Sequence, residues 1–394
     1  LSSAASDVYK RQNITNVSTS NITNSSITLT VNATAGQNAI AKYFYSNNGG
    51  SSYVESTSNT YTFSGLETGT EYDFRVYAED SAGYKSNVYS LKATTSSAVY
   101  LADYIKGLYT SDGVNGIYLH DGIGTYGTQE AGDNSYRYSG ANPNNYVCFG
   151  SDAASCPADN LYRIIGVFGN QVKLIKHEYG TTSMLGTNGA YYNTYASTGW
   201  STSYYKGSTS TSSIGVYYWN NSTNIWSESN LNTVNLNQNY LNNIGSKWSD
   251  MIAITSWKVG GNTAVNIYNV PVKSTYTNEI VSPAESTTYS AKVGLMYVSD
   301  YGYAASPENW NTNLYNYDND TNQNNNWMFM GLYEWTISRR SDFTNDVFLL
   351  DSKGSVGSDV NDIGSGVRPT FYLESNVVLS SGDGSEQNPF RIVA

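Results

Sequence analysis

Apolar and polar residues alternate along the first hundred positions in the manner of half-buried β-strands. Polar residues separate Ile27, Leu29 and Val31, and a second alternating run covers 72–78. Clusters of Gly, Asn and Ser punctuate these runs, and such residues accept the positive φ that tight turns require. The pattern predicts an all-β sandwich over residues 13–96.

One segment of this sandwich carries a family resemblance. The run Leu66-Glu-Thr-Gly-Thr-Glu-Tyr-Asp-Phe-Arg-Val-Tyr-Ala-Glu-Asp80 resembles the end of a fibronectin type III domain. The resemblance implies that the Tyr72 hydroxyl bonds back to the chain at a sheet corner. No tryptophan occupies the second strand, so Ile27 and Leu29 must fill the core. The turn that carries Arg-Gly-Asp in some integrin-binding relatives reads Asp-Ser-Ala-Gly-Tyr at 80–84, which does not support integrin binding.

The limits of the two domains follow from composition. Residues 1–12 lack the apolar core of a signal peptide and resemble a translated sequencing adapter, so we expect a non-native leader outside the fold. Small residues at 97–99 predict a linker. A second domain is then expected over 100–394, which is long enough to bury a core of its own.

The hydrophobic pattern of the second domain mixes strands and helices. Residues 161–176 predict a hairpin that turns at Gly169-Asn170. A stretch of about forty residues from His177 is rich in Gly, Ser, Thr and Tyr, and loops of that length are functional or mobile. Other predicted elements are helices over 100–107 and 227–244 and strands over 251–254, 291–298, 334–339 and 347–350.

Several motifs of this domain resemble an uncharacterised domain repeated in surface proteins of Gram-positive bacteria. The matching segments are 137–148, 161–176, 292–301, 334–338, 366–369 and 382–385. A more distant resemblance to the C-type-lectin-like fold of formylglycine-generating enzymes and phage receptor-binding proteins implies a β-rich α+β domain. In that fold the strand of Trp335 and the Gly-Val-Arg-Pro strand lie together in the core, with Arg368 in a structural ion pair. Formylglycine-generating relatives depend on cysteines near the C-terminus, and none follows Cys156 here, so that activity should be absent.

Charge and hydropathy limit the partners. The chain has a net charge of -11 from 32 acidic and 21 basic residues. Nucleic acids and anionic lipids bind clusters of Lys and Arg, and no cluster occurs, so we expect neither partner. No apolar window is long enough for a spanning helix, so no membrane insertion is expected. Only 13% of residues are charged, whereas tyrosine alone occurs 37 times. A coat of phenols, amides and hydroxyls favours an extracellular protein.

Two cysteines, Cys148 and Cys156, enclose a short loop. Their spacing is too wide for a redox pair, and without a nearby histidine they make a poor zinc site. We expect a disulfide, which for a loop of this length contributes about 2–3 kcal/mol. Oxidised cysteines indicate an oxidising compartment and therefore export. Two free, partly buried thiols remain the alternative.

The sequence offers little for catalysis. The only histidines are His120 and His177, and no serine or cysteine stands in a recognisable nucleophile motif. Glu334 follows the pattern of a structural strand residue. Paired carboxylates of the glycosidase kind are defined by their separation in space, so the sequence leaves that arrangement open.

One segment alternates oxygen ligands as calcium loops do. Asp318, Asp320 and Asn322 stand at positions one, three and five of the motif, but Gln323 and Phe329 replace the glycine and glutamate that an EF-hand requires. A calcium loop of another kind and a solvated polar turn both remain open. No other cofactor is expected.

Tryptophan is the candidate for ligand contact, because aromatic faces with amide and carboxylate groups suit glycan recognition. All eight tryptophans lie in the second domain. Apolar surroundings predict core positions for Trp257, Trp327 and Trp335. Polar surroundings predict an exposed binding platform, or pins for loops, at Trp200, Trp219, Trp226 and Trp310.

These observations favour an exported, non-catalytic recognition or adhesion protein at a bacterial cell surface. The sandwich would act as a spacer, and the second domain would bind a host or environmental glycan or a surface protein. Two alternatives remain: a purely structural stalk or repeat unit, and an unrecognised carbohydrate-active enzyme.

Overall fold

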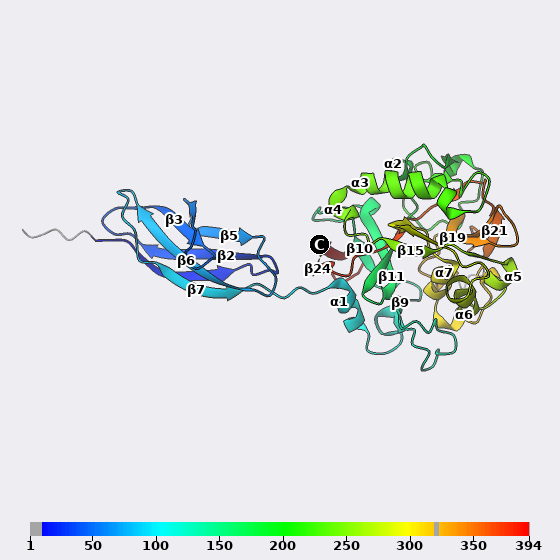
Figure 1. The fold of residues 1–394 in the computed structure, drawn as a ribbon, viewed down its shortest axis with the longest axis horizontal. Helices are drawn as coiled ribbons and strands as arrows, with labels where there is room; N and C mark the ends of the chain where they lie inside the picture. Colours follow the sequence, from blue (N-terminus) through cyan, green and yellow to red (C-terminus); the bar gives the residue numbers. More distant parts are fainter. Residues whose placement is uncertain (1–9, 319–322, 394) are drawn as a thin grey trace, which may run out of the picture. The chain divides into compact units, whose positions relative to one another are not determined.

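The chain folds into two compact units, Leu1–Ala98 and Val99–Ala394, in a computed structural model that describes residues 10–318 and 323–393. Figure 1 shows both units as ribbons. The division falls within the predicted linker. Residues 10–12 belong to the first unit, because Gln12 is only 2% exposed and donates a hydrogen bond to the Ala78 carbonyl. The fold therefore begins before residue 13.

The N-terminal unit is a sandwich of antiparallel sheets. One sheet has the order β1-β2-β5, with β1 Asn13–Ser20, β2 Ser26–Thr34 and β5 Thr60–Ser64. The other has the order β4-β3-β6-β7, with β4 Val54–Ser56, β3 Ile40–Ser46, β6 Glu71–Asp80 and β7 Tyr89–Thr94. The alternation seen in the sequence places its apolar set between the sheets, since Ile27, Leu29 and Phe74 are fully buried. The Tyr72 hydroxyl accepts a hydrogen bond from the Glu67 N–H at 2.7 Å, which confirms the expected corner.

The C-terminal unit is built on a larger mixed sheet with the order β18-β23-β12-β11-β10-β25-β24, and β8 and β9 extend it beside β11. Its strands are β8 Ile117–Leu119, β9 Tyr136–Tyr138, β10 Tyr146–Cys148, β11 Leu161–Phe168, β12 Gln171–Lys176, β18 Val293–Gly294, β23 Thr370–Tyr372, β24 Val378–Ser381 and β25 Phe390–Val393. The predicted hairpin is confirmed as β11 and β12, with Gly169 at φ 60° in its turn.

A smaller sheet has the order β13-β14-β22-β19-β20-β21, and β16 pairs with β19. Its strands are β13 Tyr191–Thr194, β14 Gly215–Tyr217, β16 Gly261–Asn262, β19 Glu334–Arg340, β20 Asp346–Leu350, β21 Val356–Val360 and β22 Ser365–Gly366. A separate ribbon joins β15 Thr255–Lys258 to β17 Thr288–Ala291.

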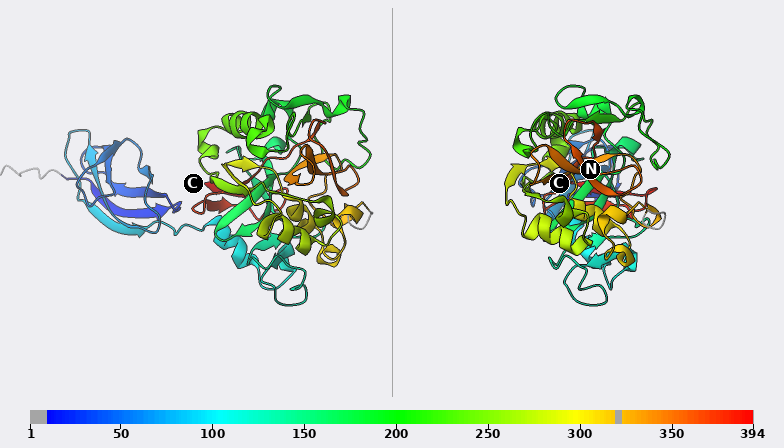
Figure 2. Two further views of the ribbon diagram at one scale, coloured as in Figure 1. Left: turned by 45° about the vertical axis from the view of Figure 1, so that its right-hand side comes forward. Right: turned by 90° about the vertical axis from the view of Figure 1, so that its right-hand side faces the viewer.

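Helices and helical turns cover these sheets (Figure 2). The helices are α1 Leu101–Leu108, α2 Thr182–Leu185, η5 Leu231–Tyr240, α3 Leu241–Ile244, α4 Ser246–Ser249, α5 Ala264–Ile267, α6 Val272–Tyr276, η6 Thr277–Val281 and α7 Val298–Ala304, of which η5 and η6 have π-helical bonding. Single 3₁₀ turns are η1 Val114–Gly116, η2 Ala158–Asn160, η3 Tyr195–Ser197, η4 Trp226–Glu228, η7 Pro307–Asn309 and η8 Leu314–Asn316.

The predicted helices over 100–107 and 227–244 are present, but two predicted strands are not. Residues 251–254 make only an isolated bridge between Ile252 and Leu373. The run 291–298 is divided between the end of β17, the short β18 and the first residue of α7. Both runs are largely apolar, and an apolar run without clear periodicity does not distinguish a strand from a buried turn.

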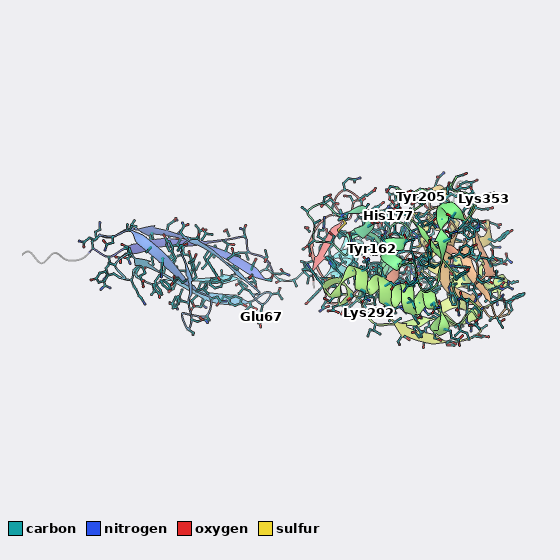
Figure 3. The ribbon with its side chains drawn as sticks, turned by 90° about the horizontal axis from the view of Figure 1, so that it is seen from above. Glu67, Tyr162, His177, Tyr205, Lys292 and Lys353 are labelled. Atoms are coloured by element: carbon teal, nitrogen blue, oxygen red, sulfur yellow. A yellow bond between two sulfur atoms is a disulfide. The ribbon has the colours of Figure 1, made fainter. Side chains whose placement is uncertain are left out.

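The larger sheet is covered on both faces. On one face Tyr162 packs against the η5–α3 segment, where its hydroxyl lies 2.8 Å from that of Tyr240 (Figure 3). On the other face Ile175 packs with α5 and α7. The second face also carries the buried charges Arg137 and Lys173, which are 2% and 1% exposed.

The two sheets meet where β22 leads into β23. Glu334 of β19 lies beside Gly366 of β22 in parallel register. Two residues further on, the Arg368 Nε donates to Glu334 Oε1 at 2.7 Å, and both side chains are 1% exposed. Arg368 Nη2 also donates to the Met328 carbonyl. The expectation that Arg368 and the Trp335 strand lie together in the core is therefore met, and Glu334 is a structural residue.

The chain enters the C-terminal unit beside the strand that precedes its last one. Leu101 N–H donates to the Val377 carbonyl and Leu379 N–H donates to the Val99 carbonyl, both flanking β24. β24 in turn pairs with β25. Residues 99–101 and 390–393 thus lie at the same edge of the larger sheet.

The predicted long loop after His177 contains short elements and is anchored to the domain by Glu178. Ser208 donates to Glu178 Oε1 through its N–H at 2.8 Å and its hydroxyl at 2.7 Å, and Thr209 N–H donates to Oε2 at 2.6 Å. Burial raises the pKa of Glu178, but these hydrogen bonds outweigh burial and bring the pKa to about 2. The segment around Ser208 and Thr209 is therefore held by one carboxylate.

Low pH should break the hydrogen bonds that the Glu178 carboxylate accepts from Ser208 and Thr209. A carboxyl whose pKa falls on folding stabilises the folded state fully above its ordinary value of 4.5 and loses that contribution as the pH falls toward about 2. Pepsin cleavage within 204–212, followed by peptide mass spectrometry, should therefore accelerate as the pH falls through this window. Glu178→Gln should be cleaved rapidly across the whole window, whereas the exposed Glu386→Gln should keep the original profile. An unchanged profile for Glu178→Gln would contradict the assignment.

Breaking the buried ion pair should be costly. Arg368→Met leaves the Glu334 carboxylate buried without a cation, so the free energy of unfolding should fall by about 3–5 kcal/mol. Guanidinium denaturation followed by tryptophan fluorescence measures this. Lys247→Met, which removes an exposed pair with Asp152, should change it by less than about 1 kcal/mol. The double variant Glu334→Leu/Arg368→Met should recover part of the loss, and equal losses in all variants would refute the structural role.

Candidate ligand-binding site

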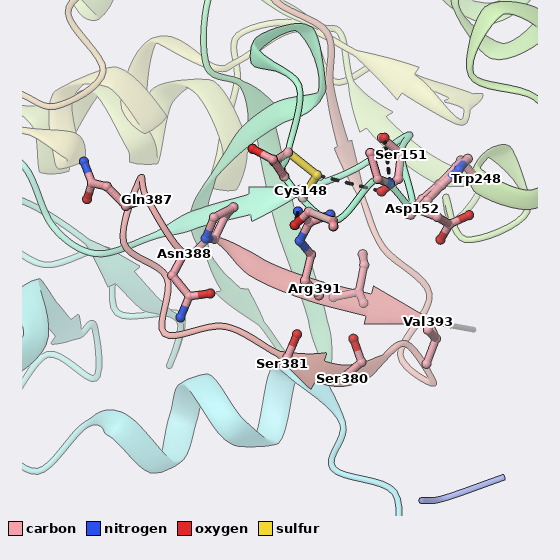
Figure 4. A pocket seen from close by; sticks show the side chains of 16 residues that line it. Cys148, Ser151, Asp152, Trp248, Ser380, Ser381, Gln387, Asn388, Arg391 and Val393 are labelled. Atoms are coloured by element: carbon pink, nitrogen blue, oxygen red, sulfur yellow. Dashed lines mark hydrogen bonds between the residues drawn. A yellow bond between two sulfur atoms is a disulfide. The ribbon is translucent and has the colours of Figure 1, made fainter. Parts of the chain in front are cut away.

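A pocket of about 350 Å³ lies between the cysteine loop and the last strands of the larger sheet (Figure 4). We call it the disulfide pocket. Cys148 and Cys156 are joined by a disulfide, as predicted. The pocket is lined by Cys148, Ser151, Asp152, Ala153, Ala154, Ser155, Cys156, Trp248, Ser380, Ser381, Gln387, Asn388, Pro389, Arg391, Ile392 and Val393.

Strand pairing places one wall of the disulfide pocket against the other. β10 pairs in parallel with β25, so Cys148 lies directly beside Arg391 in the ladder. The Arg391 Nη2 donates to the Ala154 carbonyl at 3.0 Å, which ties the cysteine loop to the last strand. The lining residues Gln387, Asn388 and Pro389 follow a tight turn in which Gly384 has φ 79°, and a Cβ there would lie 2.5 Å from the Asn144 carbonyl oxygen. Only glycine fits this position.

The lining of the disulfide pocket is dominated by hydrogen-bonding groups. It offers serine hydroxyls, two side-chain amides and the Arg391 guanidinium. Asp152 adds a carboxylate that is 64% exposed and forms an ion pair with Lys247. Trp248 supplies an aromatic edge although it is only 6% exposed. This set can donate to and accept from a polar ligand at several points, and its two charged groups, Arg391 and Asp152, have opposite sign.

Three of the four tryptophans predicted as an exposed platform are buried, so that prediction is wrong for them. Trp219, Trp226 and Trp310 are at most 1% exposed. Trp219 and Trp226 lie against each other with ring centroids 4.9 Å apart, and the Trp219 indole Nε1–H donates to the Thr336 carbonyl. Trp200 is half-buried and packs on Tyr333.

The asparagines near these tryptophans suggested an exposed segment, but their side-chain amides are themselves buried. The Asn224 side-chain N–H₂ group lies within 2.8 Å of the carbonyls of Arg340, Phe343 and Asp346. An Asn-rich segment can therefore be core when its amides satisfy backbone groups. By contrast, Trp257, Trp327 and Trp335 are buried as predicted.

The candidate calcium loop lies mostly outside the described residues. Asp318 is exposed, while Asp320 and Asn322 lie outside the described residues. Within residues 10–318 and 323–393, no group of three or more His, Cys, Asp or Glu side chains is arranged to hold a metal ion. In the same residues, no helix has both the length and the apolar character that crossing a bilayer requires.

Sequence reasoning missed the pocket residues of the last strands. Ser380, Gln387 and Arg391 carry no motif of their own. The available signal was the Gly-Asp-Gly-Ser turn at 382–385, which had to reverse the chain near the cysteine loop. The parallel pairing of β25 with β10 joins residues far apart in the sequence, and local patterns do not report it.

Comparison with known proteins identifies the first unit. Residues 12–95 match the family description "Fibronectin type III domain". The N-terminal unit is a fibronectin type III domain. The solution structure of the fibronectin type III domain of human fibronectin type III domain containing protein 3 is 20% identical, covering 24% of this chain and 94% of that chain with a TM-score of 0.19.

Other similar structures are more distant in sequence. Chitinase ChiA74 from Bacillus thuringiensis is 17% identical with a TM-score of 0.20, covering 44% of this chain and 18% of that chain. The PKD1 domain of Vibrio anguillarum Epp is 11% identical with a TM-score of 0.19, covering 23% of this chain and 98% of that chain. Over whole chains these scores carry no argument about function. Among curated proteins no match is found.

The disulfide should be needed for the shape of the pocket. The double variant Cys148→Ser/Cys156→Ser frees the loop in the unfolded state, so the free energy of unfolding should fall by about 2–3 kcal/mol. Hydrogen exchange of residues 149–155 should rise by more than this global change explains, because only Arg391, the exposed Asp152–Lys247 pair and the bonds of Asn160 to Phe149 then hold the loop. The fibronectin type III domain serves as the internal control, since its exchange should not change. Unaltered exchange at 149–155 would show that the loop does not depend on the disulfide.

Proposed function

We propose that the protein is an exported, non-catalytic recognition protein of a bacterial cell surface. The fibronectin type III domain acts as a spacer, and the C-terminal unit binds a host or environmental glycan or a surface protein. The observation that carries this proposal is the disulfide pocket, a polar recess of about 350 Å³ with many hydrogen-bonding groups. This volume is within the usual range of ligand sites.

The lining of the disulfide pocket suits a polyhydroxylated ligand. Sugar hydroxyls both donate and accept, and the Ser380 and Ser381 hydroxyls and the Gln387 amide can do the same. Arg391 adds donors and Asp152 adds acceptors. Such a set favours a neutral glycan over an anionic nucleic acid, since the chain as a whole carries a charge of -11.

Two features of the chain, its disulfide and its fibronectin type III domain, support export. The disulfide between Cys148 and Cys156 persists in an oxidising compartment. The fibronectin type III domain fits an extracellular spacer. The C-type-lectin-like interpretation of the second unit belongs to this proposal and is supported by the pairing of the Trp335 strand with the Gly-Val-Arg-Pro segment.

The titratable groups favour binding over catalysis. Burial lowers the pKa of His120 well below its ordinary value, and the nearby Arg137 lowers it further. Burial and the nearby Arg163 bring the pKa of His177 down to about 3. Both rings are therefore neutral at physiological pH and make poor proton acceptors. Arg368 binds one oxygen of Glu334, and although burial raises the pKa of this carboxyl, its side chain is sealed in the core.

A glycan and mucin array tests the proposal directly. The full chain should bind a subset of glycans, and Gln387→Ala and Arg391→Gln should each weaken that binding at least about tenfold, because each removes hydrogen bonds in a partly desolvated pocket. Lys353→Gln, an exposed cation that does not line the pocket, is the matched control and should bind as before.

Two results would overturn the assignment of a glycan to the disulfide pocket. Silence across the array from a well-folded sample would leave a structural stalk or a surface-protein ligand. Hydrolysis of a glycan on the array, seen as released reducing sugar, would establish an enzyme instead.

A further inference from the structure

A second, smaller cavity opens on the other side of the larger sheet. We call it the charged cavity; its volume is about 70 Å³, enough for two or so water molecules or one small polar group. It lies where the sheet face of β9, β12 and β23 meets α6 and the start of α7. Its lining residues are Asp133, Arg137, Phe168, Lys173, Tyr276, Ile280, Tyr297, Ser299, Asp300 and Tyr372, none of which lines the disulfide pocket.

Ion-paired side chains form the floor of the charged cavity. Arg137, Lys173 and Asp300 are 2%, 1% and 3% exposed. Lys173 Nζ donates to Asp300 Oδ2 at 2.6 Å, and the same oxygen accepts the Tyr297 N–H at 2.9 Å. The ammonium also interacts with the Tyr372 hydroxyl. Because an ammonium has three N–H donors, one remains for a group in the cavity.

The decisive feature is an unfilled gap between a guanidinium and a carboxylate. Arg137 Nη1 lies 3.8 Å from Asp300 Oδ1, which is too far for a hydrogen bond. The other nitrogens of Arg137 are engaged, Nε with the Ser135 hydroxyl and Nη2 with Asp133 Oδ2. Nη1 and Oδ1 have no hydrogen-bond partner among the described residues. Nη1 and Oδ1 therefore form a long ion pair, and both atoms keep hydrogen-bonding capacity beside the charged cavity.

A hydroxyl group has the right chemistry and size for this gap. An oxygen placed about 2.8 Å from each atom fits a 3.8 Å separation, accepting from Arg137 Nη1 while donating to Asp300 Oδ1. An anion gains little here, because the two cations Arg137 and Lys173 are already balanced by Asp133 and Asp300. An apolar group would leave both polar atoms unsatisfied.

The rim of the charged cavity adds an aromatic surface. Phe168, Tyr372 and Ile280 are partly exposed, whereas the floor is sealed. Phe168 already stacks on the Arg137 guanidinium at 4.7 Å, which fixes its ring at the rim. Rings and apolar side chains beside convergent polar groups suit the C–H faces of a sugar.

We propose that the charged cavity is a carbohydrate subsite that takes one hydroxyl of a neutral hexose between Arg137 Nη1 and Asp300 Oδ1. The Lys173 ammonium contributes a further hydrogen bond, and the hexose ring rests on Phe168 and Ile280. The site is separate from the disulfide pocket and goes beyond the proposed function, so either assignment can fail without the other.

The charged cavity binds its sugar and does not cleave it. Glycoside hydrolysis needs one carboxyl that stays protonated until it donates to the leaving group. Burial raises the pKa of Asp133, but Arg137, Ser135 and Tyr276 outweigh burial and hold the pKa well below its ordinary value. Asp133 therefore has no proton to give, and its two oxygens are filled by these same partners.

Saturation-transfer NMR of the full chain with methyl glycosides of glucose, galactose, mannose and N-acetylglucosamine tests the subsite. At least one glycoside should receive saturation, and one particular monodeoxy analogue of it should lose most of the signal. Ile280→Trp fills the mouth without removing any charge and should lower the signal at least about fivefold. Phe168→Ala, which removes the stacking wall, should lower it as well.

A control variant outside both cavities tests the specificity of these losses. Ile254→Trp, at a position that is 72% exposed and lines neither cavity, should leave the signal unchanged. Ile280 does not line the disulfide pocket, so a loss caused by Ile280→Trp belongs to the charged cavity. Melting temperatures identify variants that fail to fold. The subsite is refuted if no glycoside is saturated by the folded protein, if Ile280→Trp and Phe168→Ala both bind normally, or if all monodeoxy analogues bind alike. Displacement of the sugar by millimolar sulfate would also refute it, because that result identifies an anion site.

Discussion

Arg368 stands where the chain leaves the smaller sheet and enters the larger one, with its guanidinium sealed against Glu334 of the neighbouring strand. A charge this deep is tolerated only when its donors are satisfied, and Arg368 is satisfied by a carboxylate and by the Met328 carbonyl. These partners come from different parts of the chain, so the pair can form only when both sheets are in place. The relative position of the sheets, and with it the position of each cavity, depends on this contact.

The same rule explains how a chain with few charges builds a polar interior. Several of its cations are buried, and most are matched with a carboxylate, a carbonyl or an aromatic face; Arg163, for example, donates to Asn145 and lies 4.1 Å from the Tyr146 ring centroid. Lys176 is the exception, because its Nζ is buried without a hydrogen-bond partner among the described residues. Asparagine side-chain amides also donate hydrogen bonds to backbone carbonyls, as Asn235 does to those of Leu185 and Asn188. Tyrosine and asparagine are thus structural residues here, and their abundance does not by itself indicate a surface that binds ligands.

Sequence patterns predicted the parts of the fold that depend on residues close together in the sequence. The alternation of the fibronectin type III domain, the Gly169 turn, the disulfide and the core position of Trp335 were all readable, because each depends on near neighbours or on a specific motif. The burial of Trp219 and Trp310 was not readable, since distant segments cover them. The gap between Arg137 and Asp300 was equally hidden, because it joins β9 to α7 across the face of a sheet. Most of the candidate site belongs to this second class.

The edge at which the chain enters the C-terminal unit has a mechanical consequence. Tension applied between residues 99 and 393 would not pass through the body of the unit. It would be carried by the hydrogen bonds from Val99 and Leu101 to the segment around β24, and then by the pairing of β24 with β25. β25 carries Arg391, which holds the cysteine loop. Stretching the unit in this way would therefore deform the disulfide pocket first. Mechanical tension and a ligand bound in the pocket would both act on β25.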